Sequence, residues 1–212
     1  MIRKTMAGLV FLLGGFAAQA EPVTIAALGD SLTQGYGLVE EDGLVPQLQA
    51  WLTAQGADVR LINAGVSGDT TSGGAARVAW TLTPDVDGLI VALGGNDLLR
   101  GIDPALARAN LDSILAAAAE AKVAVLLIGM QAPGNYGPDY KADFDSIYPD
   151  LARKYGALLV TSFFSGFGTS DPAQVRALMQ ADGIHPNAEG VARIVEALGP
   201  QVLELVALAQ ER

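Results

Sequence analysis

The sequence contains no cysteine and only one histidine, His185, among its 212 residues. The absence of cysteine excludes disulfide bonds and thiol nucleophiles. With one imidazole and no thiolate, a zinc site is not expected, because such sites combine several Cys, His or carboxylate ligands. The sequence also lacks a P-loop and lacks a G-x-G-x-x-G segment that opens a helix. We therefore expect neither a metal nor a cofactor.

Basic residues are few, with 13 Lys and Arg against 23 Asp and Glu, so the net charge is −10. A chain of this charge gains no counterion release from phosphates, so neither a nucleic-acid partner nor firm docking on an anionic membrane is expected. Long hydrophobic runs are also scarce. After the first 20 residues, no segment approaches the roughly 20 apolar residues that span a membrane, so no stable membrane insertion is expected.

The first 20 residues have the pattern of a secretion signal. Arg3 and Lys4 precede an apolar stretch over Met6–Phe16, and Ala18-Gln19-Ala20 is an A-x-A cleavage site. The alternative, a membrane anchor, requires a longer apolar run. We therefore expect cleavage after Ala20, a periplasmic or secreted location, and one domain over residues 21–212, which is long enough to bury a sizeable core.

Short apolar runs alternate with longer amphipathic segments after residue 20. The runs predict five strands, over Val23–Leu28, Val59–Ile62, Gly88–Leu93, Val123–Ile128 and Ala157–Val160. Helices are predicted over Gly43–Gln55, Thr71–Leu82, Pro104–Ala121, Asp139–Tyr155 and Ala188–Leu208. Buried strands that alternate with helices are typical of a doubly wound α/β fold. The sequence therefore predicts a three-layer α/β/α sandwich around a five-stranded parallel sheet.

Three residues refine this pattern. Asp103 is expected to be the N-cap of the helix that starts at Pro104. Pro149 is expected to break the helix over Asp139–Tyr155, and Pro200 to kink or split the last helix. The longest irregular stretches are expected at Gly129–Pro138 and Phe163–Gly183, and loops of that length are often functional.

Polar, glycine-rich segments follow four of the predicted strands: Gly29-Asp30-Ser31-Leu32, Gly65-Val66-Ser67-Gly68-Asp69, Gly94-Gly95-Asn96-Asp97 and Gln131-Ala132-Pro133-Gly134-Asn135-Tyr136-Gly137. Ligands of open parallel sheets bind at the carboxyl ends of the strands, so these segments are expected at one edge. Simpler explanations exist: Ser31 could be a helix N-cap, Gly68 a turn residue, and Asn96 a turn or cap residue. Their combination favours an active site built from loops.

A serine nucleophile needs an imidazole to take its proton and a carboxylate to orient that imidazole. If the chain is a serine hydrolase, its only histidine, His185, must be the base. Asp182 precedes it by three residues, so one turn can supply both side chains, although Asp182-Gly183 could also be a plain turn. No serine lies in a G-x-S-x-G segment, which argues against the α/β-hydrolase fold.

In their order along the chain, these segments resemble the four blocks of the SGNH, or GDSL, hydrolase family, from about Val23 to Gly190. The resemblance implies the flavodoxin-like fold of that family, with Ser31 as nucleophile, His185 as base and Asp182 as orienting acid. It also implies an oxyanion hole formed by the N–H groups of Ser31 and Gly68 and by the Asn96 amide. Residues 63–70 and 133–137 are similar to the multifunctional thioesterase, arylesterase and lysophospholipase branch.

The resemblance implies a monomeric esterase that needs no cofactor and acts on small acyl or aryl esters, thioesters or lysophospholipids through an acyl-enzyme. Six apolar or amphipathic residues near the predicted mouth could line a substrate groove: Tyr36, Leu98, Leu99, Pro133, Tyr136 and Ile184. Ordinary loop packing explains each of them equally well. An acyl ester is favoured over a sugar acetate, because polysaccharide binding uses exposed tryptophans and both Trp51 and Trp80 fall on predicted helices.

Two alternative functions stay open. One is a sugar O-acetyl esterase on the same scaffold. The other is a non-catalytic protein that binds a lipid or a glycan without turning it over. The presence of all five residues, Ser31, Gly68, Asn96, Asp182 and His185, argues against the second alternative, because a binding protein has no need of them.

Overall fold

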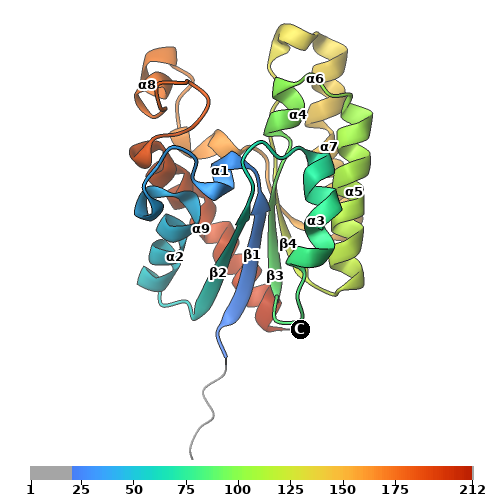
Figure 1. The fold of residues 1–212 in the computed structure, drawn as a ribbon, viewed down its shortest axis with the longest axis vertical. Helices are drawn as coiled ribbons and strands as arrows, with labels where there is room; N and C mark the ends of the chain where they lie inside the picture. The colour runs from blue at the N-terminus through green and yellow to red at the C-terminus, as the bar shows by residue number, and fades with distance from the viewer. Residues whose placement is uncertain (1–20, 212) are drawn as a thin grey trace, which may run out of the picture.

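The computed structural model describes residues 21–211, and the expected signal over residues 1–20 lies outside them. Its strands are β1 (Val23–Gly29), β2 (Val59–Gly65), β3 (Gly88–Ala92), β4 (Ala124–Ile128) and β5 (Leu158–Val160). They form one sheet in the order β2-β1-β3-β4-β5, and all four pairings are parallel (Figure 1). The predicted five-stranded parallel sheet is therefore confirmed.

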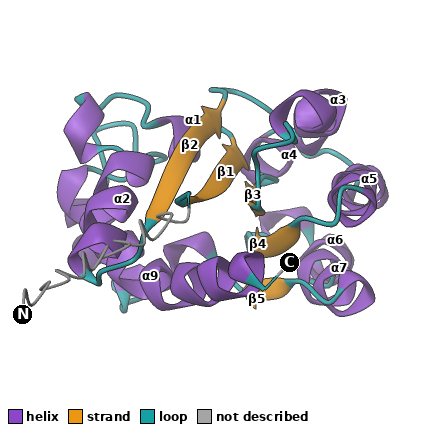
Figure 2. Ribbon diagram, turned by 90° about the horizontal axis from the view of Figure 1, so that it is seen from below, coloured by secondary structure: helices purple, strands orange, loops and turns teal. Residues whose placement is uncertain are grey.

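Helices cover both faces of this sheet (Figure 2). On one face lie α2 (Leu44–Ala54) and α9 (Ala188–Gln210); on the other lie α3 (Thr71–Thr81), α5 (Pro104–Glu120), α6 (Pro138–Asp145) and α7 (Ile147–Tyr155). Because both faces are covered, β1, β3 and β4 are buried along their whole length, which explains their unbroken apolar runs. The three-layer prediction is confirmed.

The predicted N-cap of α5 is also confirmed: Asp103 accepts a hydrogen bond from the Ala105 N–H at 2.9 Å.

Two prolines have different effects on their helices. The predicted break near Pro149 occurs between α6 and α7. Pro149 cannot donate to the carbonyl of Asp145, and its ring crowds that oxygen, so α6 ends at Asp145. Pro200 lies inside α9, which runs unbroken, so the expected split is wrong. The neighbouring Leu198 and Val202 are fully buried, and this packing holds the helix together.

Short helices occupy segments in which the sequence pattern predicts none. They are α1 (Ser31–Gln34), α4 (Gly95–Leu99), α8 (Pro172–Ala177) and 3-10 helices over Glu40–Asp42, Gly134–Tyr136 and Phe163–Phe167. The two stretches expected to be irregular therefore contain helical turns. Elements of three to six residues are too short to show a helical hydrophobic period.

No helix within residues 21–211 is both long and apolar enough to cross a membrane.

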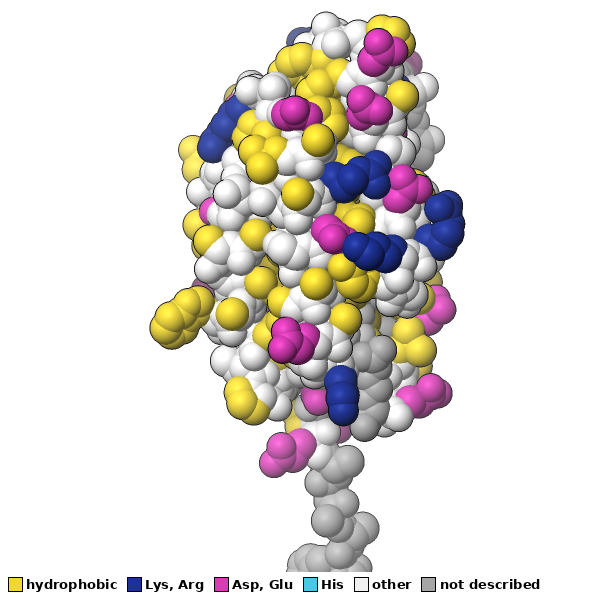
Figure 3. All heavy atoms as spheres, turned by 90° about the vertical axis from the view of Figure 1, so that its right-hand side faces the viewer, with side chains coloured by type: hydrophobic (Ala, Val, Ile, Leu, Met, Phe, Trp, Pro, Cys, Tyr) yellow, Lys and Arg dark blue, Asp and Glu magenta, His cyan; other side chains and the backbone are white. Residues whose placement is uncertain are grey.

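The outer face over α3, α5 and α7 carries scattered charges of both signs. Basic side chains on this face lie close to acidic ones (Figure 3). Two ion pairs join α5 to α7: Arg108 to Asp150 at 3.1 Å and Lys154 to Asp112 at 2.6 Å. Positive and negative side chains are therefore interspersed on this face.

The carboxyl ends of the strands meet at the upper edge of the sheet in Figure 1. Gly29, the last residue of β1, lies beside Gly65 of β2 on one side and Ala92 of β3 on the other. The segments that carry Ser31, Gly68 and Asn96 start directly after these three residues. The parallel register thus brings together three loops that are distant in the sequence.

Candidate active site

Ser31 is the first residue of α1, directly beyond the sharp turn that ends β1. Asp30 is the N-cap of this helix, because its carboxylate accepts a hydrogen bond from the Leu32 N–H at 3.0 Å. The interpretation of Ser31 as the N-cap is therefore wrong. Gly29 makes the turn possible, since a Cβ at that position would collide with the Thr33 side chain. The Ser31 hydroxyl is thereby left free to face other groups.

The structure brings Ser31, His185 and Asp182 into one hydrogen-bonded chain. His185 Nε2 lies 2.8 Å from Ser31 Oγ, and His185 Nδ1 lies 2.7 Å from Asp182 Oδ2. A carboxylate can only accept, so Nδ1 carries the proton and Nε2 keeps a lone pair that faces the serine hydroxyl. This is the arrangement that removes a proton from a serine during nucleophilic attack.

The turn that presents His185 also fixes its carboxylate partner. Asp182 Oδ1 accepts hydrogen bonds from the backbone N–H groups of Ile184 at 2.9 Å and His185 at 3.1 Å. The bond from the His185 ring, followed by these two backbone bonds, lowers the pKa of Asp182 to about 2. Gly183 has a φ of +68°, which closes the turn. Asp182-Gly183 is thus a turn, but one whose carboxylate is aimed at the imidazole.

Gly68 and Asn96 line the same cavity as Ser31. Gly68 has a left-handed φ of +82°, so its interpretation as a turn residue also holds. The Asn96 side-chain amide donates to the Asp69 carbonyl at 2.9 Å and makes a longer contact of 3.4 Å to Asp30 Oδ2. Both residues expected to supply oxyanion donors therefore lie at the same cavity as Ser31, on different loops.

Asp30 is a buried carboxylate directly behind this site, with only 1% of its surface exposed. Burial raises its pKa from 3.8 to about 6, although the bonds from Leu32 and Asn96 favour the charged form. Sequence reasoning gave Asp30 no separate role. In the structure it links the nucleophile's helix to the Asn96 amide.

Arg77 on α3 is a site residue that sequence reasoning missed. Its guanidinium donates to Asp69 Oδ2 at 2.6 Å, to the Ala64 carbonyl at 2.7 Å and to the Gly29 carbonyl at 2.8 Å. These acceptors lie at or just beyond the ends of β1 and β2. One side chain thus ties the nucleophile loop to the Gly68 loop. The only signal in the sequence is an arginine on a helix that is otherwise rich in small residues.

Asp97 and Arg100 connect the Asn96 loop to the Gly68 loop from the other side. The fully buried Asp97 carboxylate accepts from the Thr71 N–H at 2.9 Å and from the Thr71 hydroxyl at 2.7 Å. Arg100 donates to the Gly68 carbonyl at 2.8 Å. Thr71 is the first residue of α3, so the negative charge of Asp97 lies at the N-terminus of this helix, where the helix dipole stabilises it. The two loops that carry the expected oxyanion donors are therefore held together.

A cavity of about 720 Å³ opens over Ser31 and His185. All six residues expected near the mouth line it: Tyr36, Leu98, Leu99, Pro133, Tyr136 and Ile184. Tyr36 and Leu99 are 51% and 60% exposed, so loop packing alone does not account for them. Met130, Phe164 and Met179 also line the cavity and were missed, because they lie after strands or in loops without a distinctive pattern.

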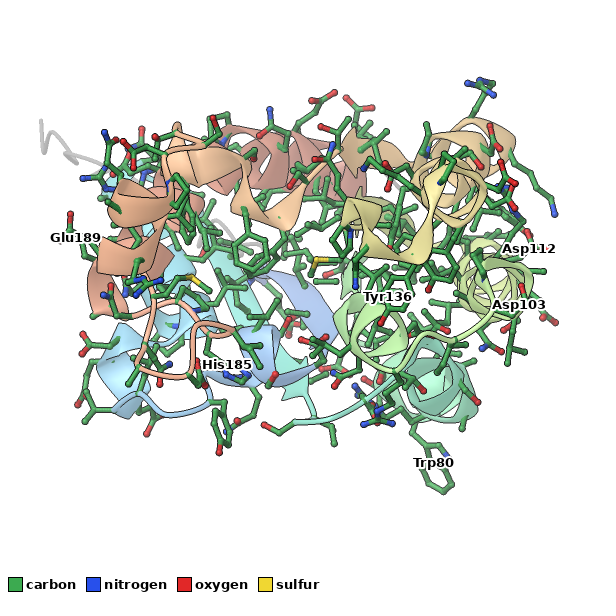
Figure 4. The ribbon with its side chains drawn as sticks, turned by 90° about the horizontal axis from the view of Figure 1, so that it is seen from above. Trp80, Asp103, Asp112, Tyr136, His185 and Glu189 are labelled. Atoms are coloured by element: carbon green, nitrogen blue, oxygen red, sulfur yellow. The ribbon has the colours of Figure 1, made fainter. Side chains whose placement is uncertain are left out.

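The two tryptophans differ in exposure. Trp51 packs against Gly199 of α9, but Trp80 on α3 is 85% exposed, so a place on a helix does not mean burial. Trp80 is absent from the cavity lining, and Figure 4 shows it pointing away from the labelled His185 and Tyr136. The exposed ring therefore does not belong to this cavity.

No cluster of three or more His, Cys, Asp or Glu side chains within residues 21–211 is arranged to hold a metal ion. The side chains and backbone at the site supply a hydroxyl, an imidazole, carboxylates and amide donors. This combination can transfer an acyl group to the serine and then to water.

Comparison with known proteins finds one family over most of the chain. The profile of the GDSL-like Lipase/Acylhydrolase family matches residues 27–193. Esterase TesA of Pseudomonas aeruginosa is 40% identical over 189 residues, covering 89% of this chain and 92% of that protein. Thioesterase 1/protease 1/lysophospholipase L1 of Escherichia coli K12 is 33% identical over 185 residues, covering 86% and 85%.

Solved structures share the fold over a similar length. A crystal structure of TesA superposes with a TM-score of 0.77 at 38% identity, covering 86% of this chain and 99% of that chain. The structure of AlinE4, an SGNH-hydrolase family esterase, superposes with a TM-score of 0.72 at 44% identity, covering 88% and 98%. The resemblance noted in the sequence thus extends to the arrangement of the elements.

Proposed function

Because the chain belongs to the GDSL-like lipase/acylhydrolase family and is a serine ester hydrolase, we propose that Ser31, His185 and Asp182 carry its catalysis. The observation that supports this assignment is the hydrogen-bonded chain from Ser31 Oγ through the imidazole to Asp182, with distances of 2.8 and 2.7 Å, at the floor of an open cavity. The fixed imidazole is ready to accept the hydroxyl proton as the serine attacks.

Acylation and deacylation use the same groups. Ser31 Oγ attacks the acyl carbonyl carbon while His185 Nε2 takes the hydroxyl proton. The imidazolium then gives this proton to the leaving oxygen or sulfur as its bond to carbon breaks, which leaves an ester on Ser31. Water attacks this ester while His185 takes one of its protons, and the imidazolium then returns a proton to Ser31 Oγ as the bond from Oγ to the acyl carbon breaks and the acid is released. Asp182 remains charged throughout and stabilises the imidazolium.

We assign the oxyanion hole to the N–H groups of Ser31 and Gly68 and to the Asn96 amide. The bond to the Asp69 carbonyl fixes one amide proton of Asn96, whereas the other makes only the longer contact to Asp30. That second proton is available to a negatively charged oxygen in the cavity. Donors fixed before the reaction stabilise developing charge without reorganisation.

Carboxylic esters are the proposed substrates, with acyl esters, aryl esters, thioesters and lysophospholipids as candidate classes. The side chains at the mouth are mainly apolar or aromatic, which suits an acyl chain or an aryl group. We also propose a periplasmic location, and this location favours esters over acyl-CoA as the substrates. Detection of a mature chain that begins at Glu21 in a periplasmic extract would support it.

The test is hydrolysis of p-nitrophenyl esters from acetate to palmitate by the mature chain and by Ser31→Ala. We expect turnover by the wild type and its loss in the variant, with circular dichroism showing that the variant is folded. Turnover that survives in Ser31→Ala would overturn the assignment of the nucleophile. A folded wild type without turnover on any ester would favour the binding-protein alternative.

A further inference from the structure

The cavity over Ser31 has two separate walls. On one side, the Tyr136 hydroxyl donates to the Leu98 carbonyl at 2.8 Å, which joins the loop after β4 to α4. On the other side, the Tyr36 ring lies against His185, with a distance of 4.7 Å between ring centroids. Viewed from above, His185 and Tyr136 project from different segments and lie apart over the sheet (Figure 4). A substrate bound at Ser31 would contact both walls.

The chemistry assigns different parts of the substrate to these walls. In the tetrahedral intermediate, the negative oxygen faces the donors of Gly68 and Asn96. The leaving oxygen must face His185 Nε2, because that nitrogen supplies its proton when the bond to carbon breaks. The acyl chain needs a third direction, and the part of the cavity lining that carries Tyr136 and Leu98 is left for it. The leaving group therefore lies beside the residue that packs against the imidazole.

Tyr36 occupies that position and is held firmly. Its N–H donates to the Ser31 carbonyl at 3.1 Å, and its own carbonyl accepts from Gln180 Nε2 at 2.8 Å. The Gln180 N–H in turn donates to the His185 carbonyl at 2.7 Å. The backbone of Tyr36 is thus linked directly to Ser31 and, through Gln180, to His185. Because 51% of Tyr36 is exposed, its ring can also contact a ligand.

We propose that Tyr36 forms the leaving-group subsite and favours esters whose leaving alcohol carries an aromatic ring. This inference rests on the proposed function, because it requires His185 to be the acid of the acylation step. The leaving ring packs on Tyr36 while its oxygen receives the proton. Favourable contact between two aromatic rings corresponds to a selectivity of about 2- to 10-fold.

The test compares benzyl acetate with cyclohexylmethyl acetate. The two esters share the acyl group and release primary alcohols of similar size, but only one alcohol is aromatic. Their kcat/KM values report acylation, the half-reaction in which the leaving group is present. For Tyr36→Leu we expect the benzyl-to-cyclohexylmethyl ratio to fall about 2- to 10-fold relative to the wild type. Tyr36→Phe should keep the ratio, since it keeps the ring.

Two controls separate a subsite from a general defect. Trp80→Leu removes an aromatic ring that is 85% exposed and outside the cavity, so both kcat/KM values should stay at the wild-type level. The acyl-length optimum with p-nitrophenyl esters should stay the same in Tyr36→Leu, because the acyl chain contacts the other wall. A shifted optimum would overturn the assignment of the walls.

Failure of this inference can be told apart from failure of the proposed function. If the wild type hydrolyses both acetates, Ser31→Ala hydrolyses neither, and Tyr36→Leu keeps the wild-type ratio, the subsite assignment is wrong and the esterase mechanism stands. An equal loss of kcat/KM on both acetates would also overturn the subsite assignment, because it would show that Tyr36 acts through His185 and not on the leaving group. If the folded wild type hydrolyses no ester, the proposed function itself fails.

Discussion

At the scale of single residues, the properties of Asp182 come from very local bonds. Its carboxylate receives one bond from the His185 ring and two from the backbone of its own turn. Because its pKa is lowered from 3.8 to about 2, the folded state binds this proton more weakly than the unfolded state does. The stability from these bonds is therefore present above about pH 4 and is lost as the pH falls toward 2. Asp182 stays charged over the range in which imidazoles ordinarily titrate.

Replacing Asn96 by alanine tests a single oxyanion donor. Removal of one such donor typically lowers the rate by about 100- to 1,000-fold, because the donor acts mainly on charge that develops in the transition state. We expect Asn96→Ala to lower kcat by this factor while KM changes little, as measured with p-nitrophenyl butyrate. A kcat close to that of the wild type would show that Asn96 is not an oxyanion donor.

At the scale of elements, Arg77 joins α3 to the ends of β1 and β2. Its three acceptors include the carboxylate of Asp69, and the two side chains are only 23% and 18% exposed. A planar guanidinium can reach three acceptors in fixed directions, whereas a lysine ammonium at the end of a flexible chain cannot match this fork. The relative position of the two loops therefore depends on this residue.

We expect Arg77→Lys to fold but to lose function. Two carbonyls lose charge-assisted bonds, so the free energy of unfolding should fall by about 1.5–3 kcal/mol, measured by urea denaturation. A displacement of the catalytic loops by about 1 Å would lower kcat/KM by about 100-fold. Arg193→Lys is the matched control, because Arg193 is exposed and pairs with the exposed Glu189, and its change should stay within about 0.5 kcal/mol. Equal effects of the two variants would contradict a special role for Arg77.

At the scale of the whole molecule, burial of Asp30 makes stability depend on pH. Its pKa is about 6 in the folded state against 3.8 as the ordinary value, so the folded state binds more protons between these values. The contribution of Asp30 to stability is therefore largest below about pH 4 and is lost as the pH rises through 6. One pKa unit corresponds to about 1.4 kcal/mol, so the loss amounts to about 3 kcal/mol.

Asp30→Asn isolates this contribution, because asparagine does not titrate. We expect the free energy of unfolding of the wild type, minus that of the variant, to fall by about 2.4 kcal/mol between pH 4 and pH 7, because part of the total change already occurs below pH 4. Urea denaturation at several pH values measures this difference. A difference that stays constant over the range would show that the pKa of Asp30 is not raised by folding.

Local sequence patterns were sufficient to predict the fold class, and they also predicted which segments lie at the cavity. Strands such as β3 and β4 are buried on both faces and therefore appear as unbroken apolar runs, which are local patterns. The segments with Ser31 and Asn96 could be placed at one edge because parallel strands all end there. The turn of Asp182 and His185 could also be anticipated, since only three positions separate these residues.

The side chains that hold the loops of the site together could not be predicted from local patterns, because their partners are distant in the sequence. Arg77 bonds to Gly29, 48 positions away, and the Gln180 side chain reaches the Tyr36 carbonyl across 144 positions. Such contacts depend on how helices and loops pack above the sheet, and no local hydrophobic period encodes them. The exposure of Trp80 could not be read from the sequence for the same reason, nor could the absence of a split at Pro200 in α9. Burial and helix continuity are set by what packs against a residue, and that is a property of the folded chain.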